Sequence, residues 1–271
     1  MSVLTFSLIQ TKLFWEDAAA NRKMFEAKID SIKERTEVVV LPEMFSTGFS
    51  MQAEKLAETM NGETVTWMKR IAAEKRIILV GSLMIKEEEQ YYNRLIWMLP
   101  NGGYGCYDKR HLFAYGDESN HYNAGNKRLI ASAKGWKINL QICYDLRFPV
   151  WARQSPALQQ DGIAEGELEY DVLMYVANWP ERRSLAWKAL LQARAIENQS
   201  YVIGVNRVGD DGNNVYHSGD SMVIDPLGEI LYHKKDEEDI FTITLDKKHL
   251  ETIRTKFPFW KDADPFSITN E

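Results

Sequence analysis

Short apolar runs alternate along the chain with longer stretches in which apolar and polar residues mix. Each run is rich in valine, isoleucine and leucine. A continuous apolar run of this length is typical of a strand that is buried on both faces of a sheet. We therefore predict buried strands at Leu4–Ile9, Val38–Leu41, Ile77–Leu83, Ile138–Ile142, Val172–Ala177 and Tyr201–Val205.

The mixed stretches between these runs predict helices. In one of them Ala186, Leu190, Ala193 and Ile196 recur at helical spacing, which places them on one face. Helices are expected at Trp15–Lys33, Val65–Ala73 and Arg183–Asn198. Because strands alternate with helices, the pattern favours an α/β fold.

Two regions have the pattern of β-hairpins, with paired strand-like segments around an Asn-Gly-Gly turn and an Asp-Pro-Leu-Gly turn. Glycine, proline, asparagine and aspartate at such positions are typical of tight turns. The hairpins are expected at Tyr91–Leu99 with Tyr104–Tyr107, and at Gly219–Ile224 with Glu229–His233. Antiparallel hairpins next to strands joined by helices predict mixed sheets.

The chain is expected to form a single domain over residues 1–271. No linker rich in proline, glycine or serine divides it, and no internal repeat is visible. The polar and acidic segment Ser155–Glu169 is interpreted as a surface excursion. The charged run Lys234–Asp239 is interpreted as a solvated turn between strands rather than a binding site.

Composition narrows the class of protein. Hydrophobic residues make up 45% and charged residues 27% of the chain, as in an ordinary globular protein. The net charge is -6, and lysine and arginine are spread along the chain without a basic stripe that would neutralise phosphates. Nucleic acid is therefore not an expected partner.

The location of the protein is predicted from what its sequence lacks. The segment Met1–Gln10 has no basic region followed by a long apolar one, so no secretory signal is expected. No run reaches the roughly 20 apolar residues that a membrane-spanning helix needs. The two cysteines, Cys106 and Cys143, have no spacing suited to zinc and do not make a disulfide framework. We expect a cytoplasmic protein with no membrane partner.

Three reactive side chains stand at the ends of apolar strands or hairpins, where α/β proteins build their sites. Glu43 ends Val-Val-Val-Leu-Pro-Glu, Lys109 follows the first hairpin, and Cys143 ends Ile-Asn-Leu-Gln-Ile-Cys. The residues after Cys143 predict a turn into a short helix, whose N-terminus favours a thiolate. A cysteine alone in an apolar strand is usually a core residue, so the hypothesis depends on the three together.

The strings around these residues resemble the nitrilase superfamily of carbon-nitrogen hydrolases. They are Leu-Pro-Glu-Met-Phe, Asp-Lys-Arg-His-Leu-Phe and Cys-Tyr-Asp-Leu-Arg-Phe-Pro, followed by Val-Ala-Asn-Trp-Pro, Gln-Ala-Arg-Ala-Ile-Glu-Asn and Gly-Asp-Ser. The resemblance covers nearly the whole chain. It implies a four-layer α-β-β-α sandwich with mixed sheets, paired into a homodimer, and a reaction that needs no metal or organic cofactor.

The resemblance also implies a catalytic triad. Cys143 matches the nucleophile of the family, Glu43 its general base and Lys109 its oxyanion partner. The second glutamate of the family, in the loop after the lysine, resembles Glu118, although the neighbouring Asp117 is a rival for that position. Such a triad would cleave an amide through a cysteine thioester and release ammonia.

The residues after the nucleophile bear on the substrate. True nitrilases tend to carry Cys-Trp-Glu, whereas Cys-Tyr-Asp, which begins at Cys143, is similar to amidase branches. The strings are most similar to the omega-amidase group, which deamidates 2-oxoglutaramate and 2-oxosuccinamate. Such substrates end in a carboxylate, so an arginine is expected near the pocket.

Several residues are therefore candidates for contact with a small amide substrate. Arg182 and Arg183 are candidates for binding its carboxylate, and the backbone NH of Tyr144 for binding the oxyanion. Phe45, Phe49 and Trp179 are candidates for the walls, while His111 is expected to pack or to orient a neighbour.

Two other functions remain open from the sequence. One is hydrolysis of an N-carbamoyl compound by the same type of site, which would release carbon dioxide with ammonia. The other, less favoured because every triad position is filled, is a catalytically silent binding protein on this fold.

Overall fold

The computed structural model describes residues 2–154, 168–264 and 266–269, and its strands form two sheets. The first sheet has the order β13-β1-β2-β3-β4-β5. Within it, β2 is parallel to β1 and to β3, while the other neighbours are antiparallel. Its strands are β1 (Val3–Gln10), β2 (Val38–Val40), β3 (Ile78–Glu87), β4 (Gln90–Met98), β5 (Tyr104–Asp108) and β13 (Asp239–Asp246).

The second sheet is also mixed. Its order is β10-β11-β9-β8-β7-β6, with β12 paired to β11. Three central strands, β7, β8 and β9, are parallel to one another. The strands are β6 (Leu129–Ala133), β7 (Trp136–Ile142), β8 (Val172–Ala177), β9 (Tyr201–Asn206), β10 (Val208–Asp210), β11 (Tyr216–Ile224) and β12 (Ile230–Lys235).

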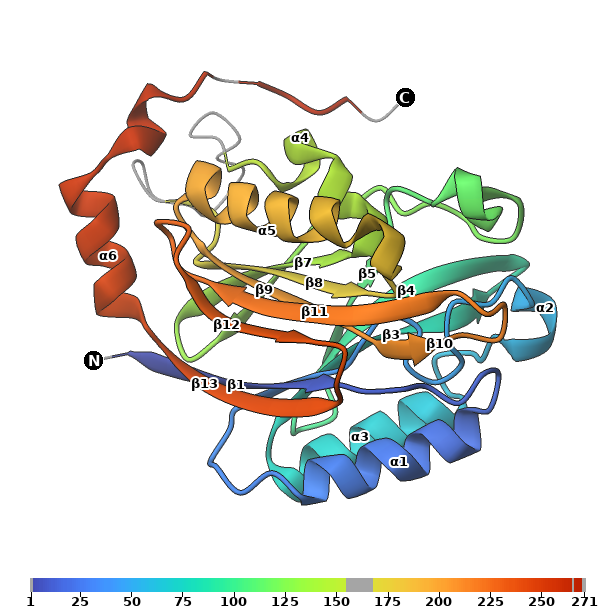
Figure 1. The fold of residues 1–271 in the computed structure, drawn as a ribbon. Coiled ribbons are helices and arrows are strands. Elements are labelled where there is room, and N and C mark those ends of the chain that lie inside the picture. The colour runs from blue at the N-terminus through green and yellow to red at the C-terminus, as the bar shows by residue number, and fades with distance from the viewer. Residues whose placement is uncertain (1, 155–167, 265, 270–271) are drawn as a thin grey trace.

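Helices cover the outer faces of both sheets (Figure 1). The pair α1 and α3 lies against the first sheet, and α4 and α5 lie against the second. The helices are α1 (Ala18–Asp30), α2 (Ala53–Leu56), α3 (Glu63–Lys75), α4 (Pro149–Ala152), α5 (Ser184–Asn198) and α6 (Lys247–Lys256). The expected four-layer α-β-β-α sandwich is confirmed. No helix in the described ranges is long and apolar enough to cross a membrane.

The burial of β2 explains why its sequence is uniformly apolar. Val38 and Val40 belong to the core between the two sheets, whereas Val39 belongs to the core beneath α1 and α3. Successive side chains of a strand point to opposite faces, and here both faces are covered. Full burial of such a side chain contributes about 1.5 to 3 kcal/mol, so every position favours an apolar residue.

The predicted boundaries need correction at several elements. The first helix begins at Ala18 instead of Trp15, because the Asp17 side chain accepts a hydrogen bond from the Ala20 N–H and caps it there. The strand predicted to end at Leu83 continues to Glu87 and turns back into β4. That hairpin was missed because its turn is a Glu-Glu pair without glycine or asparagine. The predicted hairpin of β4 and β5 is confirmed.

Four elements and two segments differ from the prediction or extend it. The strands β6, β10 and β13 and the helix α6 were not predicted. The charged run Lys234–Asp239 is the turn from β12 to β13, and it passes from one sheet to the other. Most of the segment Ser155–Glu169 lies outside the described residues. Its last residue departs from the surface interpretation, because Glu169 is buried and forms an ion pair of 2.9 Å with Arg128.

Candidate active site

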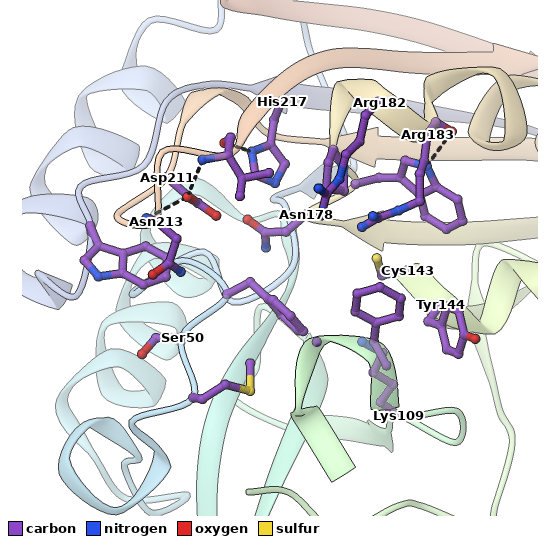
Figure 2. A pocket seen from close by; sticks show the side chains of 18 of the residues that line it. Ser50, Lys109, Cys143, Tyr144, Asn178, Arg182, Arg183, Asp211, Asn213 and His217 are labelled. Atoms are coloured by element: carbon purple, nitrogen blue, oxygen red, sulfur yellow. Dashed lines mark hydrogen bonds between the residues drawn. The ribbon is translucent and has the colours of Figure 1, made fainter. Parts of the chain in front are cut away.

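Four of the predicted site residues meet where strand ends of the two sheets converge. Glu43 follows β2 and Lys109 follows β5 in the first sheet, while Cys143 follows β7 in the second. Glu118 begins the short 3-10 helix η2 (Glu118–Asn120). In Figure 2, Lys109, Cys143 and Tyr144 lie on the same side of a pocket. The structure therefore brings together residues that are far apart in the sequence.

Lys109 lies between two carboxylates and is buried. Its Nζ is 2.9 Å from Glu43 Oε1 and 2.8 and 3.0 Å from the two oxygens of Glu118. The side chains of all three residues are 0% exposed. Burial acts to lower the pKa of Lys109, but the carboxylates of Glu118 and Glu43 outweigh it and raise that pKa. The lysine is therefore held as an ammonium.

Glu118 and Asp117 have different surroundings, which bears on the alternative left open by the sequence. Besides Lys109, the Glu118 carboxylate accepts hydrogen bonds from Phe113 N at 2.6 Å and from Asn93 Nδ2 at 3.2 Å. Asp117 is exposed and its carboxylate accepts from Asn120. Burial raises the pKa of Glu118, against the opposing effect of Lys109. Glu118 is thus the acid placed beside Lys109.

Cys143 sits at a sharp turn between β7 and the 3-10 helix η3 (Cys143–Arg147). Its φ is 44°, in the left-handed region that few residues other than glycine adopt. Burial, followed by the negative charge of Glu43, raises the pKa of the Cys143 thiol well above its ordinary value. The helix N-terminus was expected to favour a thiolate at Cys143, whereas in the structure burial and the charge of Glu43 act in the opposite direction.

Two asparagines that the sequence did not single out hold Glu43 in place. Asn93 Nδ2 donates to Glu43 Oε1 at 2.8 Å, and the Asn178 backbone N donates to Glu43 Oε2 at 2.8 Å. Asn178 Nδ2 also donates to the Glu43 carbonyl oxygen. Asn93 stands beside Arg94 in the half of β4 that begins Gln-Tyr-Tyr, and no pattern there marks it. Asn178 lies inside the Val-Ala-Asn-Trp-Pro string. With Lys109, these donors give the carboxylate one orientation.

A third buried carboxylate, that of Asp145, shapes the turn that carries the cysteine. Asp145 accepts hydrogen bonds from Tyr107 OH at 2.7 Å and from Ile142 N at 3.0 Å. The His111 ring lies 2.8 Å from Asp145 and stacks on Phe148, with ring centroids 3.9 Å apart. His111 therefore packs and orients a neighbour, as predicted.

The pocket in front of Cys143 has a volume of about 540 Å³. The predicted residues Phe49, Tyr144, Trp179, Arg182 and Arg183 all line it. The prediction that Phe45 forms a wall is wrong. Its ring is fully buried beneath α1 and α3, 5.5 Å from the ring of Phe25 and 5.9 Å from that of Trp67.

Comparison with known proteins identifies the family. A family model described as carbon-nitrogen hydrolase matches residues 5–255. The chain belongs to the carbon-nitrogen hydrolase family. It is similar to omega-amidase YafV of Escherichia coli, with 43% identity over 99% of this chain and 100% of that protein. It is also similar to 2-oxoglutaramate amidase of Bacillus subtilis, with 31% identity over 95% of this chain and 96% of that protein.

Solved structures agree with this assignment. A CN-hydrolase superfamily protein from Xanthomonas campestris, with an arsenic adduct in its active site, has 42% identity and a TM-score of 0.95; the match covers 99% of this chain and 100% of that one. A branch 10 member of the nitrilase superfamily from Saccharomyces cerevisiae has 26% identity and a TM-score of 0.82, with 94% of each chain covered. The predicted resemblance to the nitrilase superfamily is confirmed.

Three arginines line the pocket of this carbon-nitrogen hydrolase. Arg147, which the sequence did not single out, joins Arg182 and Arg183. The guanidinium of Arg147 lies 5.0 Å from the Trp179 ring centroid, and that of Arg183 lies 5.0 Å from the Phe113 ring centroid. Burial and the like charge of Arg182, with a smaller effect of Arg147, lower the pKa of Arg183. Positive charge is therefore concentrated in this wall.

The part of the chain that the structure describes offers no place for a metal ion. Within the described ranges, no group of three or more histidine, cysteine, aspartate or glutamate side chains has an arrangement that would hold an ion. What the site of this hydrolase offers is a thiol, two carboxylates and an ammonium.

If Glu118 orients Lys109, we expect Glu118→Gln to lower kcat by about 10²-fold, the usual effect of disturbing one oxyanion donor. The variant keeps the shape of the side chain but removes its charge, so steady-state kinetics and thermal melting should separate rate from folding. Asp117→Asn is the matched control and should retain the parent rate, since Asp117 is exposed and its carboxylate contacts Asn120 and His121. Full activity in Glu118→Gln would remove the second acid from the mechanism.

Proposed function

We propose that this hydrolase is an omega-amidase, which releases ammonia from the terminal amide of 2-oxoglutaramate or 2-oxosuccinamate. The main support is the arrangement of the pocket: a buried thiol, carboxylate and ammonium face a wall that carries three arginines. A small amide that ends in a carboxylate matches this arrangement, because its amide can meet the thiol and its carboxylate can meet an arginine. The names of the relatives, omega-amidase and 2-oxoglutaramate amidase, support the same substrate.

The first half of the proposed reaction transfers the acyl group to the enzyme. The Cys143 thiol gives its proton to Glu43 as the sulfur attacks the amide carbon. A thiol with a raised pKa needs such a base, and general base catalysis of this kind typically contributes about 10² to 10⁴ in rate. The tetrahedral intermediate collapses when the carbon-nitrogen bond breaks. Glu43 passes the proton to the nitrogen, and ammonia leaves from the Cys143 thioester.

The oxygen of the tetrahedral intermediate carries a negative charge that must be stabilised. In our proposal Lys109 and the backbone N–H of Tyr144 are the donors. The two contacts from Lys109 to Glu118 can share one ammonium proton, which leaves a third N–H for substrate. Tyr144 lies in the first turn of η3, where backbone N–H groups lack partners within the helix. Loss of one oxyanion donor typically costs about 10² to 10³ in kcat.

The second half of the reaction hydrolyses the thioester. Water enters the place that ammonia left, and Glu43 takes its proton as the oxygen attacks the acyl carbon. When the carbon-sulfur bond breaks, the proton returns to Cys143 and the 2-oxo acid leaves with a second carboxylate. The same base thus acts in both halves, which is why its fixed orientation matters.

We also propose that the protein is a cytoplasmic homodimer with a single domain per chain. Both cysteines are free, which suits a reducing compartment. Exposed apolar side chains on α4 and α5 support self-association, because Leu185 is 81%, Val150 55% and Ile196 52% exposed. Leu185 and Ile196 both belong to α5, where a separation of about three turns places them on one side of the helix. Exposed apolar residues that share one face are typical of protein interfaces.

The dimer proposal predicts that Leu185→Glu lowers the molar mass measured by light scattering from that of a dimer to that of a monomer. A charge within an apolar interface would be buried without a partner. Tyr104→Glu, at a residue that is 52% exposed on β5, is the control and should leave the mass unchanged. A parent protein that is already monomeric contradicts the proposal.

The proposed nucleophile predicts that Cys143→Ala abolishes amidase activity and leaves the fold intact. Mass spectrometry of the parent enzyme, quenched during turnover, should show an acyl adduct on Cys143. Cys106 serves as the control, since burial raises its pKa to about 11 and it does not line the pocket. An adduct on Cys106, or turnover by Cys143→Ala, would overturn the mechanism.

The proposed substrate predicts a preference for amides that carry a distal carboxylate. A charge-assisted contact with arginine contributes about 1.5 to 3 kcal/mol, or roughly 10-fold to 150-fold in kcat/KM. The measurement compares 2-oxoglutaramate with an uncharged aliphatic amide of the same length, in the parent and in Arg182→Ala and Arg183→Ala. If the parent hydrolyses both amides equally well, the omega-amidase proposal fails while the triad stands.

A further inference from the structure

The Gly219-Asp220-Ser221 string contacts none of the reacting groups, yet its backbone is unusual. Gly219 and Asp220 have φ values of 74° and 58°. The register between β11 and β12 shifts between Gly219 and Ser221, which marks a bulge. A Cβ at position 219 would lie 2.3 Å from the Gln10 side chain, so only glycine fits there. Bulges of this kind re-aim a side chain.

The side chain that this bulge aims is the carboxylate of Asp220, which is only 1% exposed. It accepts hydrogen bonds from Ser184 Oγ at 2.7 Å, Ser218 Oγ at 2.6 Å and His233 Nε2 at 2.7 Å. Its carbonyl oxygen accepts from Trp187 Nε1 at 2.8 Å. Burial acts to raise the pKa of Asp220, but these side-chain hydrogen bonds outweigh it and lower that pKa. The group is therefore a buried, fully bonded carboxylate.

Two of these partners, Ser184 and Trp187, belong to the beginning of α5. Ser184 is the first residue of that helix, and Trp187 lies one turn further on. Arg183 directly precedes Ser184, and its carbonyl oxygen accepts a hydrogen bond from Trp179 Nε1 at 2.8 Å (Figure 2). The main chain of Arg183 is thus fixed on one side by Trp179 and on the other by Asp220.

The side chain of Arg183 has few contacts of its own. Within the described part of the chain, Arg183 makes no ion pair with a carboxylate, and its guanidinium rests on the Phe113 ring at 5.0 Å. A guanidinium binds a carboxylate through two parallel hydrogen bonds, so its position must be set closely. That position depends on how the main chain of Arg183 is anchored.

We propose that Asp220 is a positioning residue for substrate recognition: it anchors the start of α5 so that Arg183 meets the substrate carboxylate. This inference rests on the proposed omega-amidase function. A purely structural role for Asp220 would instead stabilise the fold and affect all substrates alike. The two roles differ in which kinetic constant responds and for which substrate.

The test compares Ser184→Ala with Ser218→Ala. Each variant removes one hydrogen bond to the same carboxylate of Asp220, and both serines are buried, but only Ser184 belongs to α5. For Ser184→Ala, we expect KM for 2-oxoglutaramate to rise by about fivefold to tenfold, with kcat unchanged. Its kcat/KM for an uncharged aliphatic amide of the same length should stay at the parent value. Ser218→Ala should leave all these constants unchanged.

Asp220→Asn provides a second measurement and should raise KM for 2-oxoglutaramate more than Ser184→Ala does, again without loss of activity on the uncharged amide. Equal KM values in the two serine variants would overturn the inference, as would a parallel loss of activity on both substrates. A parent enzyme that does not prefer the carboxylate would overturn the omega-amidase function together with the inference. If the parent enzyme prefers 2-oxoglutaramate but the two serine variants have equal KM values, the inference alone fails and the omega-amidase function stands.

Discussion

The buried ammonium of Lys109 is the charge on which the arrangement of the active site depends. Glu43 and Glu118 would otherwise be two like charges facing each other in a space from which water is excluded. Removing one partner from a buried ionic group typically destabilises a protein by about 3 to 5 kcal/mol. One lysine therefore holds together segments that follow β2 and β5 and the turn that begins η2. The same contacts keep the proposed base and the proposed oxyanion donor at fixed positions.

The two sheets contribute different parts of this site, so their packing and the chemistry are linked. Glu43 follows β2 of the first sheet, but the backbone N–H of Asn178, which follows β8 in the second sheet, donates to its carboxylate. Within the first sheet, Ser82 on β3 accepts a hydrogen bond from Met44 N at 2.8 Å and fixes the segment after β2. A displacement of one sheet along the other would separate the base from the thiol. The dense core between the sheets thus also preserves the geometry of the site.

The sequence predicted the architecture well where burial leaves a pattern. Val38–Leu41 was recognisable because a strand covered on both faces is apolar at every position. The turn between β3 and β4 was not recognisable, since Glu88 adopts a φ of 53°, which is unusual for a glutamate. The single-domain organisation over residues 1–271 stays a prediction.

For the site, the motifs located Glu43, Lys109 and Cys143, but pattern alone did not reveal what surrounds them. Arg147 reached the pocket because η3 turns it there, and Asn93 joined two carboxylates only through the pairing of β4 with its neighbours. The effect of burial on the Cys143 thiol could not be predicted for a related reason. A helix N-terminus is visible in a sequence, whereas burial beside an acid is a property of the folded chain.

The left-handed backbone at Cys143 restricts which residues evolution can place there. A β-branched side chain is strongly disfavoured at positive φ, so threonine is excluded even though it carries a hydroxyl group. Serine fits the backbone, but its hydroxyl is far harder to ionise than a thiol. Changes of specificity in descendants of this protein are therefore expected to accumulate in the pocket walls while the proposed nucleophile, Cys143, stays fixed.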